Sequence, residues 1–140
     1  MKLYVASSWR NTKQPLVVAQ LRDWGHEVYD FRNPREDDSG FHWSEIDPDW
    51  QHWAPIQFRN ALKHPLALKG FRSNVNAMCW ADACVLVLPC GRSAHLEAGW
   101  FTGEKPLYIL LSDGEPELMY AMATKLCVSL DKLKAALAET

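Results

Sequence analysis

The strongest constraint on the fold is the stretch Ala83–Trp100, ACVLVLPCGRSAHLEAGW. Its first part, Ala83–Leu88, is an unbroken apolar run that is too short to span a membrane and favours a strand buried on both faces, as in a parallel sheet. Pro89 ends the run, a small polar turn follows, and helical spacing resumes with Leu96. A strand, a glycine-containing turn and a helix start form the arrangement at which α/β proteins bind ligands, because free backbone N–H groups converge there. We therefore predict that this stretch forms the floor of an active site.

The rest of the sequence alternates short apolar runs with segments of helical periodicity. Four further strands are expected at Lys2–Ala6, Glu27–Phe31, Pro106–Leu111 and Leu126–Val128. Helices are expected at Pro15–Trp24, Ile56–Lys63, Phe71–Trp80, from Leu96 to about Gly103, at Glu115–Met122 and at Leu130–Leu137. Val75, Met78 and Cys79 are expected to point inward, and Met119, Tyr120 and Met122 are interpreted as core residues. Strands that alternate with helices predict one doubly wound α/β domain over residues 1–140, with about five parallel strands.

The composition of the chain argues against several classes of partner and site. The chain of 140 residues carries a net charge of only -2, which gives no field that would attract a nucleic acid polymer or an acidic membrane. No apolar run approaches 18 residues and no signal peptide follows Met1, so we expect a cytoplasmic protein. The four cysteines form no CxxC pair, and the histidines show no metal-ligand spacing. We therefore expect reduced thiols and no metal site.

Residues 32–55 interrupt the alternation. The segment contains an acidic run and then FHWSEIDPDWQHW, and it follows neither a strand period nor a helix period. Loops of this length in compact domains are usually binding loops or lids. Its aromatic rings suit two interpretations equally, a cover for a flat polar ligand such as a nucleobase and a loop folded over its own aromatic cluster.

Polar side chains follow the ends of two predicted strands. Ser8 and Arg10 come after the first strand, and Arg92 and Ser93 come after the apolar run. A hydroxyl beside a guanidinium suits the recognition of a phosphate or a sugar. The chain has neither GxGxxG nor GxxxxGK[ST], so we expect no dinucleotide cofactor and no P-loop.

Three segments of the chain, KLYVASSWRN, ADACVLVLP and GRSAHLEAGW, resemble motifs of the nucleoside 2-deoxyribosyltransferases and related nucleotide N-glycosidases. The family pattern is an N-terminal strand with a Gly-Ser-x-Arg type turn, followed later by an apolar strand and Gly-x-x-x-Glu-x-Gly. The resemblance covers most of the chain but not Phe41–His64. It implies a flavodoxin-like (Rossmann-like) domain and a retaining attack on the N-glycosidic bond of a nucleoside or nucleoside monophosphate. It also implies a homodimer or larger homo-oligomer, in which Glu117–Tyr120 can reach the site of a neighbouring subunit.

The resemblance assigns roles by position. It implies that Glu97 is the nucleophile, that Ser8 and Arg10 contact the sugar or phosphate side of the ligand, and that Gly91 and Ser93 hold its 5′ end. Independently of the resemblance, a carboxylate can stabilise or trap the positive charge that builds on the sugar carbon when an N-glycosidic bond breaks. We expect the helix dipole to keep this glutamate ionised. The alternative reading is an acidic residue that only stabilises its helix terminus.

Two positions depart from the family pattern. Asn74 falls near a position where an aspartate usually helps to protonate the leaving base, and His95 replaces a small residue. An amide can bind a base but cannot supply a proton at neutral pH. We expect both residues to bind substrate, with Trp9 and the segment around Trp43 flanking the base. These departures leave open a second hypothesis, a nucleotide-binding or sensing domain without turnover. A third is an interaction protein that uses the Trp-rich segment.

Overall fold

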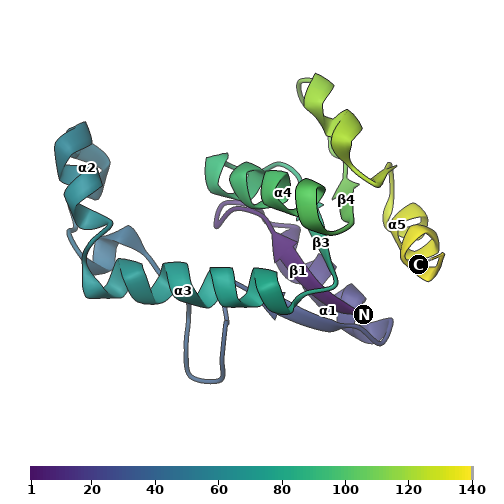
Figure 1. Ribbon diagram of the computed structural model, residues 1–140, viewed down its shortest axis with the longest axis horizontal. Coiled ribbons are helices and arrows are strands. Elements are labelled where there is room, and N and C mark those ends of the chain that lie inside the picture. The colour runs from purple at the N-terminus through teal and green to yellow at the C-terminus, as the bar shows by residue number, and fades with distance from the viewer. Residues whose placement is uncertain (140) are drawn as a thin grey trace.

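The computed structural model describes residues 1–139, so Thr140, the last residue of the expected domain, lies outside the described residues. Its centre is a sheet of five parallel strands in the order β2-β1-β3-β4-β5 (Figure 1). The strands are β1 (Lys2–Ala6), β2 (Glu27–Asp30), β3 (Ala83–Val87), β4 (Leu107–Leu110) and β5 (Lys125–Cys127). The helices are α1 (Gln14–Asp23), α2 (Pro55–Ala61), α3 (Pro65–Trp80), α4 (Arg92–Glu104) and α5 (Leu130–Ala138). This arrangement is the flavodoxin-like α/β fold and confirms the predicted fold class.

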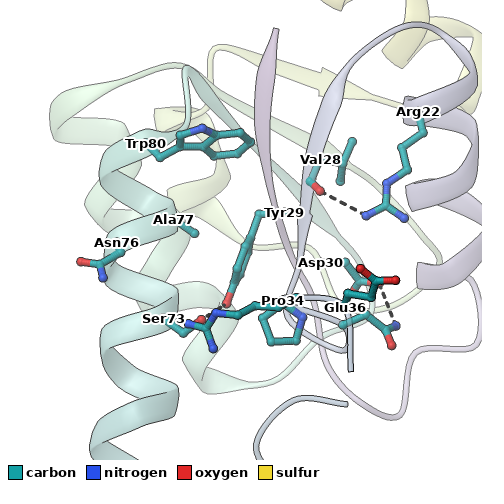
Figure 2. A pocket seen from close by; sticks show the side chains of 12 residues that line it. Arg22, Val28, Tyr29, Asp30, Pro34, Glu36, Ser73, Asn76, Ala77 and Trp80 are labelled. Carbon is teal, nitrogen blue, oxygen red and sulfur yellow. Dashed lines mark hydrogen bonds between the residues drawn. The ribbon is translucent and has the colours of Figure 1, made fainter. Parts of the chain in front are cut away.

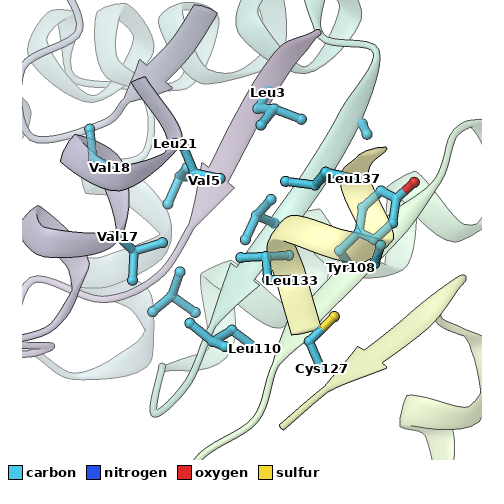
Figure 3. Packing of buried hydrophobic residues seen from close by; sticks show 14 residues of the cluster. Leu3, Val5, Val17, Val18, Leu21, Tyr108, Leu110, Cys127, Leu133 and Leu137 are labelled. Carbon is cyan, nitrogen blue, oxygen red and sulfur yellow. The ribbon is translucent and has the colours of Figure 1, made fainter. Parts of the chain in front are cut away.

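The central strand β3 is buried at every position, as its uninterrupted apolar sequence predicts. On one face of the sheet, Val17 and Leu21 of α1 and Leu133 and Leu137 of α5 pack on the strands (Figure 3). On the other face, α3 and α4 pack on the strands through a second buried set: Ala77, Met78, Ala94, Ala98 and Phe101. The strand order reverses between β1 and β3, so that ligand sites are expected where these two strands end.

Helix α3 begins six residues before the predicted start at Phe71. Pro65 occupies its first position, where a missing N–H costs nothing, and the side chain of His64 accepts a hydrogen bond from the Leu66 N–H at 3.1 Å. The prediction that Cys79 points inward is wrong, because this residue is exposed. Ala77 and Met78 occupy the sheet-facing side, and Cys79 is rotated about 100° from its neighbour.

In place of the helix predicted at Glu115–Met122, the structure has a 3-10 helix of five residues, η3 (Leu118–Met122). The interpretation of its methionines as core residues is also wrong, because Leu118 is 85%, Met119 60% and Met122 51% exposed. The apolar spacing predicts one face of an amphipathic helix. Five residues of 3-10 helix are too few to bury such a face, and these side chains remain in contact with solvent.

The Trp-rich segment folds over an aromatic cluster of its own. It contains two 3-10 turns, η1 (Trp43–Glu45) and η2 (Trp50–His52). The Trp43 ring contacts the rings of Phe41, Trp53 and Phe58 at centroid distances of 4.8, 5.7 and 5.5 Å. Asp47 accepts a hydrogen bond from the indole N–H of Trp53 at 2.8 Å. The segment leads into α2, which stands away from the sheet at the far end of α3 (Figure 1).

Within residues 1–139, none of the helices combines the length and apolar character needed to cross a membrane.

Candidate functional site

The turns that follow β1 and β3 are bonded to each other. The Ser7 hydroxyl donates to the Val87 carbonyl at 2.9 Å. The amide of Asn11 donates to the carbonyls of Val87 and Pro89 at 3.2 and 3.0 Å, and this side chain is buried. Its own oxygen accepts from the backbone N–H groups at the start of α1. These bonds fix the two turns at the switch point of the sheet as one unit.

Arg32, the second residue after β2, holds the turn after β1 from the other side. Its Nη2 atom donates to the carbonyls of Ser8, Trp9 and Asn11 at 2.8, 2.9 and 2.8 Å. The guanidinium also lies 5.3 Å from the centroid of the Trp9 ring. Arg32 therefore shapes the predicted Ser8–Arg10 turn, and this nitrogen is already committed to backbone carbonyls.

Glu97 is the sixth residue of α4, on the flank that faces β1. The hydroxyl of the fully buried Tyr4 donates to its Oε2 atom at 2.6 Å. Burial raises the pKa of Glu97 to about 7, and the hydrogen bond from Tyr4 opposes this rise. The expectation that the helix dipole keeps this carboxyl ionised is wrong, because Glu97 lies beyond the first turn and desolvation dominates. Near neutral pH the group is divided between its two protonation states.

A chain of aromatic and polar side chains connects Glu97 to α3. The rings of Tyr4 and Tyr29 are stacked, with centroids 5.4 Å apart and planes 12° from parallel. The Tyr29 hydroxyl donates to Oδ1 of Asn74 at 2.8 Å and lies 3.0 Å from the Ser73 hydroxyl. Asn74 is thus joined to the Glu97 centre through two phenols.

The three predicted residues after β1 lie in one turn. The Ser8 hydroxyl accepts a hydrogen bond from the Arg10 backbone N–H at 3.1 Å, and the Arg10 side chain is exposed. The Trp9 ring lies 4.1 Å from the His42 ring, centroid to centroid, and 40% of Trp9 remains exposed. The Trp-rich segment therefore reaches the switch point through His42.

The predicted residues after β3 divide between the two flanks of α4. Gly91 caps this helix, and Arg92 and Ser93 are exposed in its first turn. His95 lies on the flank away from Glu97, where its Nδ1 lies 2.8 Å from the Gly91 carbonyl and its Nε2 2.9 Å from the Tyr120 hydroxyl. The fold therefore does not bring His95 to the carboxylate.

Cys90 lies between the two flanks, with its Sγ atom 3.6 Å from Nδ1 of His95. Burial raises the pKa of this thiol to about 11, and the nearby Glu97 carboxylate adds to the rise. Cys90 is therefore a thiol near neutral pH, whereas nucleophilic cysteines have a lowered pKa.

Two cavities flank this centre, and Glu97 lines neither. One, of about 470 Å³, runs along the open edge of β2, with Tyr29, Ser73 and Trp80 among its lining residues (Figure 2). The other, of about 390 Å³, lies between α4 and η3. Its polar lining residues are His95, Thr102, Glu117 and Tyr120, and the rest of its lining is mostly apolar. The Tyr29 ring, stacked on Tyr4, borders the first cavity.

Four residues of this site were missed in the sequence: Tyr4, Asn11, Tyr29 and Arg32. The two tyrosines lie inside predicted strands, where the sequence pattern favours core residues. Asn11 and Arg32 do follow strand ends, which is a usable signal, but the carbonyls that they bind become neighbours only in the folded sheet.

No protein-family model matches the sequence, and none of the curated proteins matches it. Among solved structures, the chain is similar to a 2-deoxyribosyltransferase from the psychrotolerant bacterium Bacillus psychrosaccharolyticus. The similarity has a TM-score of 0.53 and a sequence identity of 21%, and it covers 86% of this chain and 79% of that chain. This likeness concerns the fold, which agrees with the strand order described above.

Proposed function

We propose that this protein cleaves or transfers the N-glycosidic bond of a (deoxy)nucleoside or nucleoside monophosphate, with Glu97 as a retaining nucleophile. The observation that carries the proposal is the partly buried Glu97 carboxyl, which the Tyr4 hydroxyl orients at 2.6 Å. A carboxylate fixed in this way can trap the cationic sugar carbon as a covalent glycosyl ester. The similarity in fold to a 2-deoxyribosyltransferase supports a small-molecule nucleoside as the substrate.

The remaining predicted residues would hold the ligand on either side of the carboxylate. The 5′ end, with or without a phosphate, would lie at Gly91–Ser93, where the thirteen-residue helix α4 begins and presents free N–H groups. Arg10 and Arg92 have exposed guanidinium groups that suit a phosphate. Trp9, with 40% of its surface free, would flank the base.

The test is a chromatographic assay of base release and base exchange. Purified protein is incubated with ribo- and deoxyribonucleosides and their 5′-monophosphates, with and without a second free base. Free base indicates hydrolysis, and a new nucleoside indicates transfer. We expect Glu97→Ala to lose turnover and Glu104→Ala, an exposed position at the end of the same helix, to keep it. Equal turnover by Glu97→Ala and the parent protein would refute the role of Glu97.

A second candidate function is a nucleotide-binding or sensing domain on the same scaffold. The observation that favours it is Asn74, because an amide cannot protonate a departing base near neutral pH. Ligand binding raises the apparent stability of a protein whether or not a product forms. A nucleotide that raises the melting temperature, without base release over long incubation, would support this alternative.

Two expectations from the resemblance remain predictions. The first is that the chain acts as one nucleoside 2-deoxyribosyltransferase-like domain. The second is a homodimer or larger homo-oligomer, which light scattering coupled to size-exclusion chromatography would measure directly.

A further inference from the structure

The side chains linked to Glu97, by the hydrogen bond from Tyr4 and the stacking of Tyr29 on Tyr4, are all weakly acidic. They are the Tyr4 phenol, the Tyr29 phenol, the Ser73 hydroxyl and the Asn74 amide. Burial is the main cause that raises the pKa of both phenols above the usual value. None of these four groups is a carboxylic acid or an imidazole, the groups that usually protonate a leaving group near pH 7.

The orientation of the Asn74 side chain also argues against a proton donor at this position. Its Oδ1 accepts the proton of the Tyr29 hydroxyl at 2.8 Å, so the Tyr29 proton is directed at the amide. The other half of the side chain, the NH₂ group, can only donate hydrogen bonds. Asn74 can therefore bind an acceptor atom on a base, but neither it nor Tyr29 is arranged to transfer a proton to that base.

Among residues 1–139, two carboxylates near Tyr29 are already engaged, and two more, Glu36 and Glu117, line the flanking cavities, neither of which Glu97 lines. The Asp38 carboxylate binds Arg35 at 3.3 Å and accepts from the Gly40 N–H at 2.9 Å. Asp30 is buried and accepts from the Gln14 amide at 2.8 Å and from the Arg32 N–H at 2.9 Å. Two thiols also face the carboxylate, Cys84 and Cys90, and burial raises the pKa of both. His95 lies on the other flank of α4, beside Tyr120.

The segment of residues 36–49 is strongly acidic. It contains six Asp or Glu residues and no Lys or Arg, so the segment remains net negative after Arg35 pairs with Asp38. This acidic segment lies between the turn after β1 and helix α3, because the His42 ring contacts Trp9 and a Cβ at Gly70 would lie 2.9 Å from Cβ of Phe41. Gly70 is one helical turn before Asn74. Aromatic rings combined with negative charge favour a flat cation over a neutral ring.

We infer that the preferred substrates are nucleosides whose base carries a formal positive charge, such as N7-alkylated purine nucleosides or N-ribosylpyridinium compounds. The inference rests on the proposed function and defines the substrate class of that site. The Glu97 carboxylate attacks the anomeric carbon, the bond from this carbon to the ring nitrogen breaks, and its electron pair neutralises the positive nitrogen. The base leaves as a neutral molecule and needs no proton. Water then cleaves the glycosyl ester, which releases the sugar, a proton and the carboxylate.

The test compares charged and neutral bases in the parent protein and in Asn74→Asp. The substrates are 7-methylguanosine against guanosine, and N-ribosylnicotinamide as a second charged base that distinguishes the pyridinium class from the purine class. An added acid accelerates departure of a neutral base by about 10²–10⁴-fold. We expect Asn74→Asp to lower the ratio of kcat/KM for 7-methylguanosine over guanosine by at least about 10-fold. The comparison between proteins cancels the different intrinsic lability of the two substrates.

Asn60→Asp is the matched control, because it adds the same charge at an exposed helical position, in α2, that lines neither cavity. We expect it to keep the parental ratio. A second measurement needs no variant at position 74: the pH profile of kcat/KM for N-ribosylnicotinamide should rise to a plateau with an apparent pKa near 7, without a falling limb up to pH 9. The rise reports ionisation of Glu97, and a falling limb would reveal an acid and overturn the inference.

The outcomes separate this inference from the proposed function. Cleavage of guanosine with the same kcat/KM as 7-methylguanosine, or an unchanged ratio in a folded Asn74→Asp variant, overturns the charged-base inference and leaves the glycosidase function in place. Release of base at the same rate by the parent and by Glu97→Gln overturns the proposed function and, with it, the inference.

Discussion

The hydrogen bond from Tyr4 to Glu97 makes a prediction about pH dependence. In Tyr4→Phe the ring keeps its place in the core and its stacking on Tyr29, and only the hydroxyl is lost. That hydroxyl donates to Oε2 of Glu97 at 2.6 Å and lowers the pKa of the carboxyl, in opposition to burial. Without it, the charged form of Glu97 is less stable and its pKa must rise above about 7.

The size of the effect follows from the strength of the bond. A hydrogen bond to a charged group is worth about 1.5–3 kcal/mol, which corresponds to a rise of about 1–2 pKa units. At pH 7 the ionised fraction of Glu97 then falls from about one half to between about a tenth and a hundredth. We expect kcat/KM at pH 7 to fall about 5–50-fold and to recover as the pH rises toward 9.

Two measurements test this reasoning. The pKa of Glu97 can be followed by carbon NMR of glutamate-labelled protein, with Glu97→Gln used to assign the signal. The pH profile of kcat/KM should shift by the same amount as the NMR pKa. Tyr29→Phe is the matched control, because it removes a phenol that is bonded to Asn74 and leaves the bond from Tyr4 intact. An unchanged pKa in Tyr4→Phe, or a loss of activity that higher pH does not restore, would refute the coupling.

Three further predictions concern stability. The pKa of Glu97 is about 7 in the folded protein, against an ordinary value of 4.5. Between these pH values the folded state binds more protons than the unfolded state, so the free energy of unfolding falls as the pH rises. In urea titrations Glu97→Gln should remove up to about 3 kcal/mol of this fall. Arg32→Ala loses the bonds to three carbonyls and should cost about 2–4 kcal/mol in the same assay, against about 0.5 kcal/mol or less for the exposed Arg59→Ala. Trp43→Ala removes three ring contacts and should destabilise the protein by about 2 kcal/mol. If this variant resisted protease as well as the parent protein does, the aromatic cluster would not be what orders the Trp-rich segment.

The fold was predictable because local signals agreed with one another. The apolar run at β3 identified a strand with two covered faces, and the alternation of strands and helices identified parallel pairing. The start of α3 and the short 3-10 helix η3 differ from the prediction. The start of α3 depends on a local signal, because His64 and Pro65 cap and begin this helix. At η3 the outcome depends on tertiary support, because no layer within residues 1–139 covers the apolar side chains.

The candidate site was predictable only as positions along the chain. The sequence identifies Glu97 and the turns after β1 and β3, because chemistry-bearing residues follow strand ends there. It does not reveal the pKa of Glu97, since desolvation comes from residues distant in the chain. Nor does it distinguish the phenol of Tyr4, which bonds the carboxyl, from an ordinary buried ring.

The central claim, that Glu97 is a covalent nucleophile, is tested most directly by trapping the glycosyl ester. A nucleoside with a 2-deoxy-2-fluoro sugar destabilises the cationic transition states and slows hydrolysis of the ester, so the intermediate should accumulate. Mass spectrometry of the intact protein and of its peptides then locates the sugar. We predict one sugar on the peptide that contains Glu97, and none in Glu97→Gln. Release of the base without an adduct, or an adduct on another residue, would contradict it.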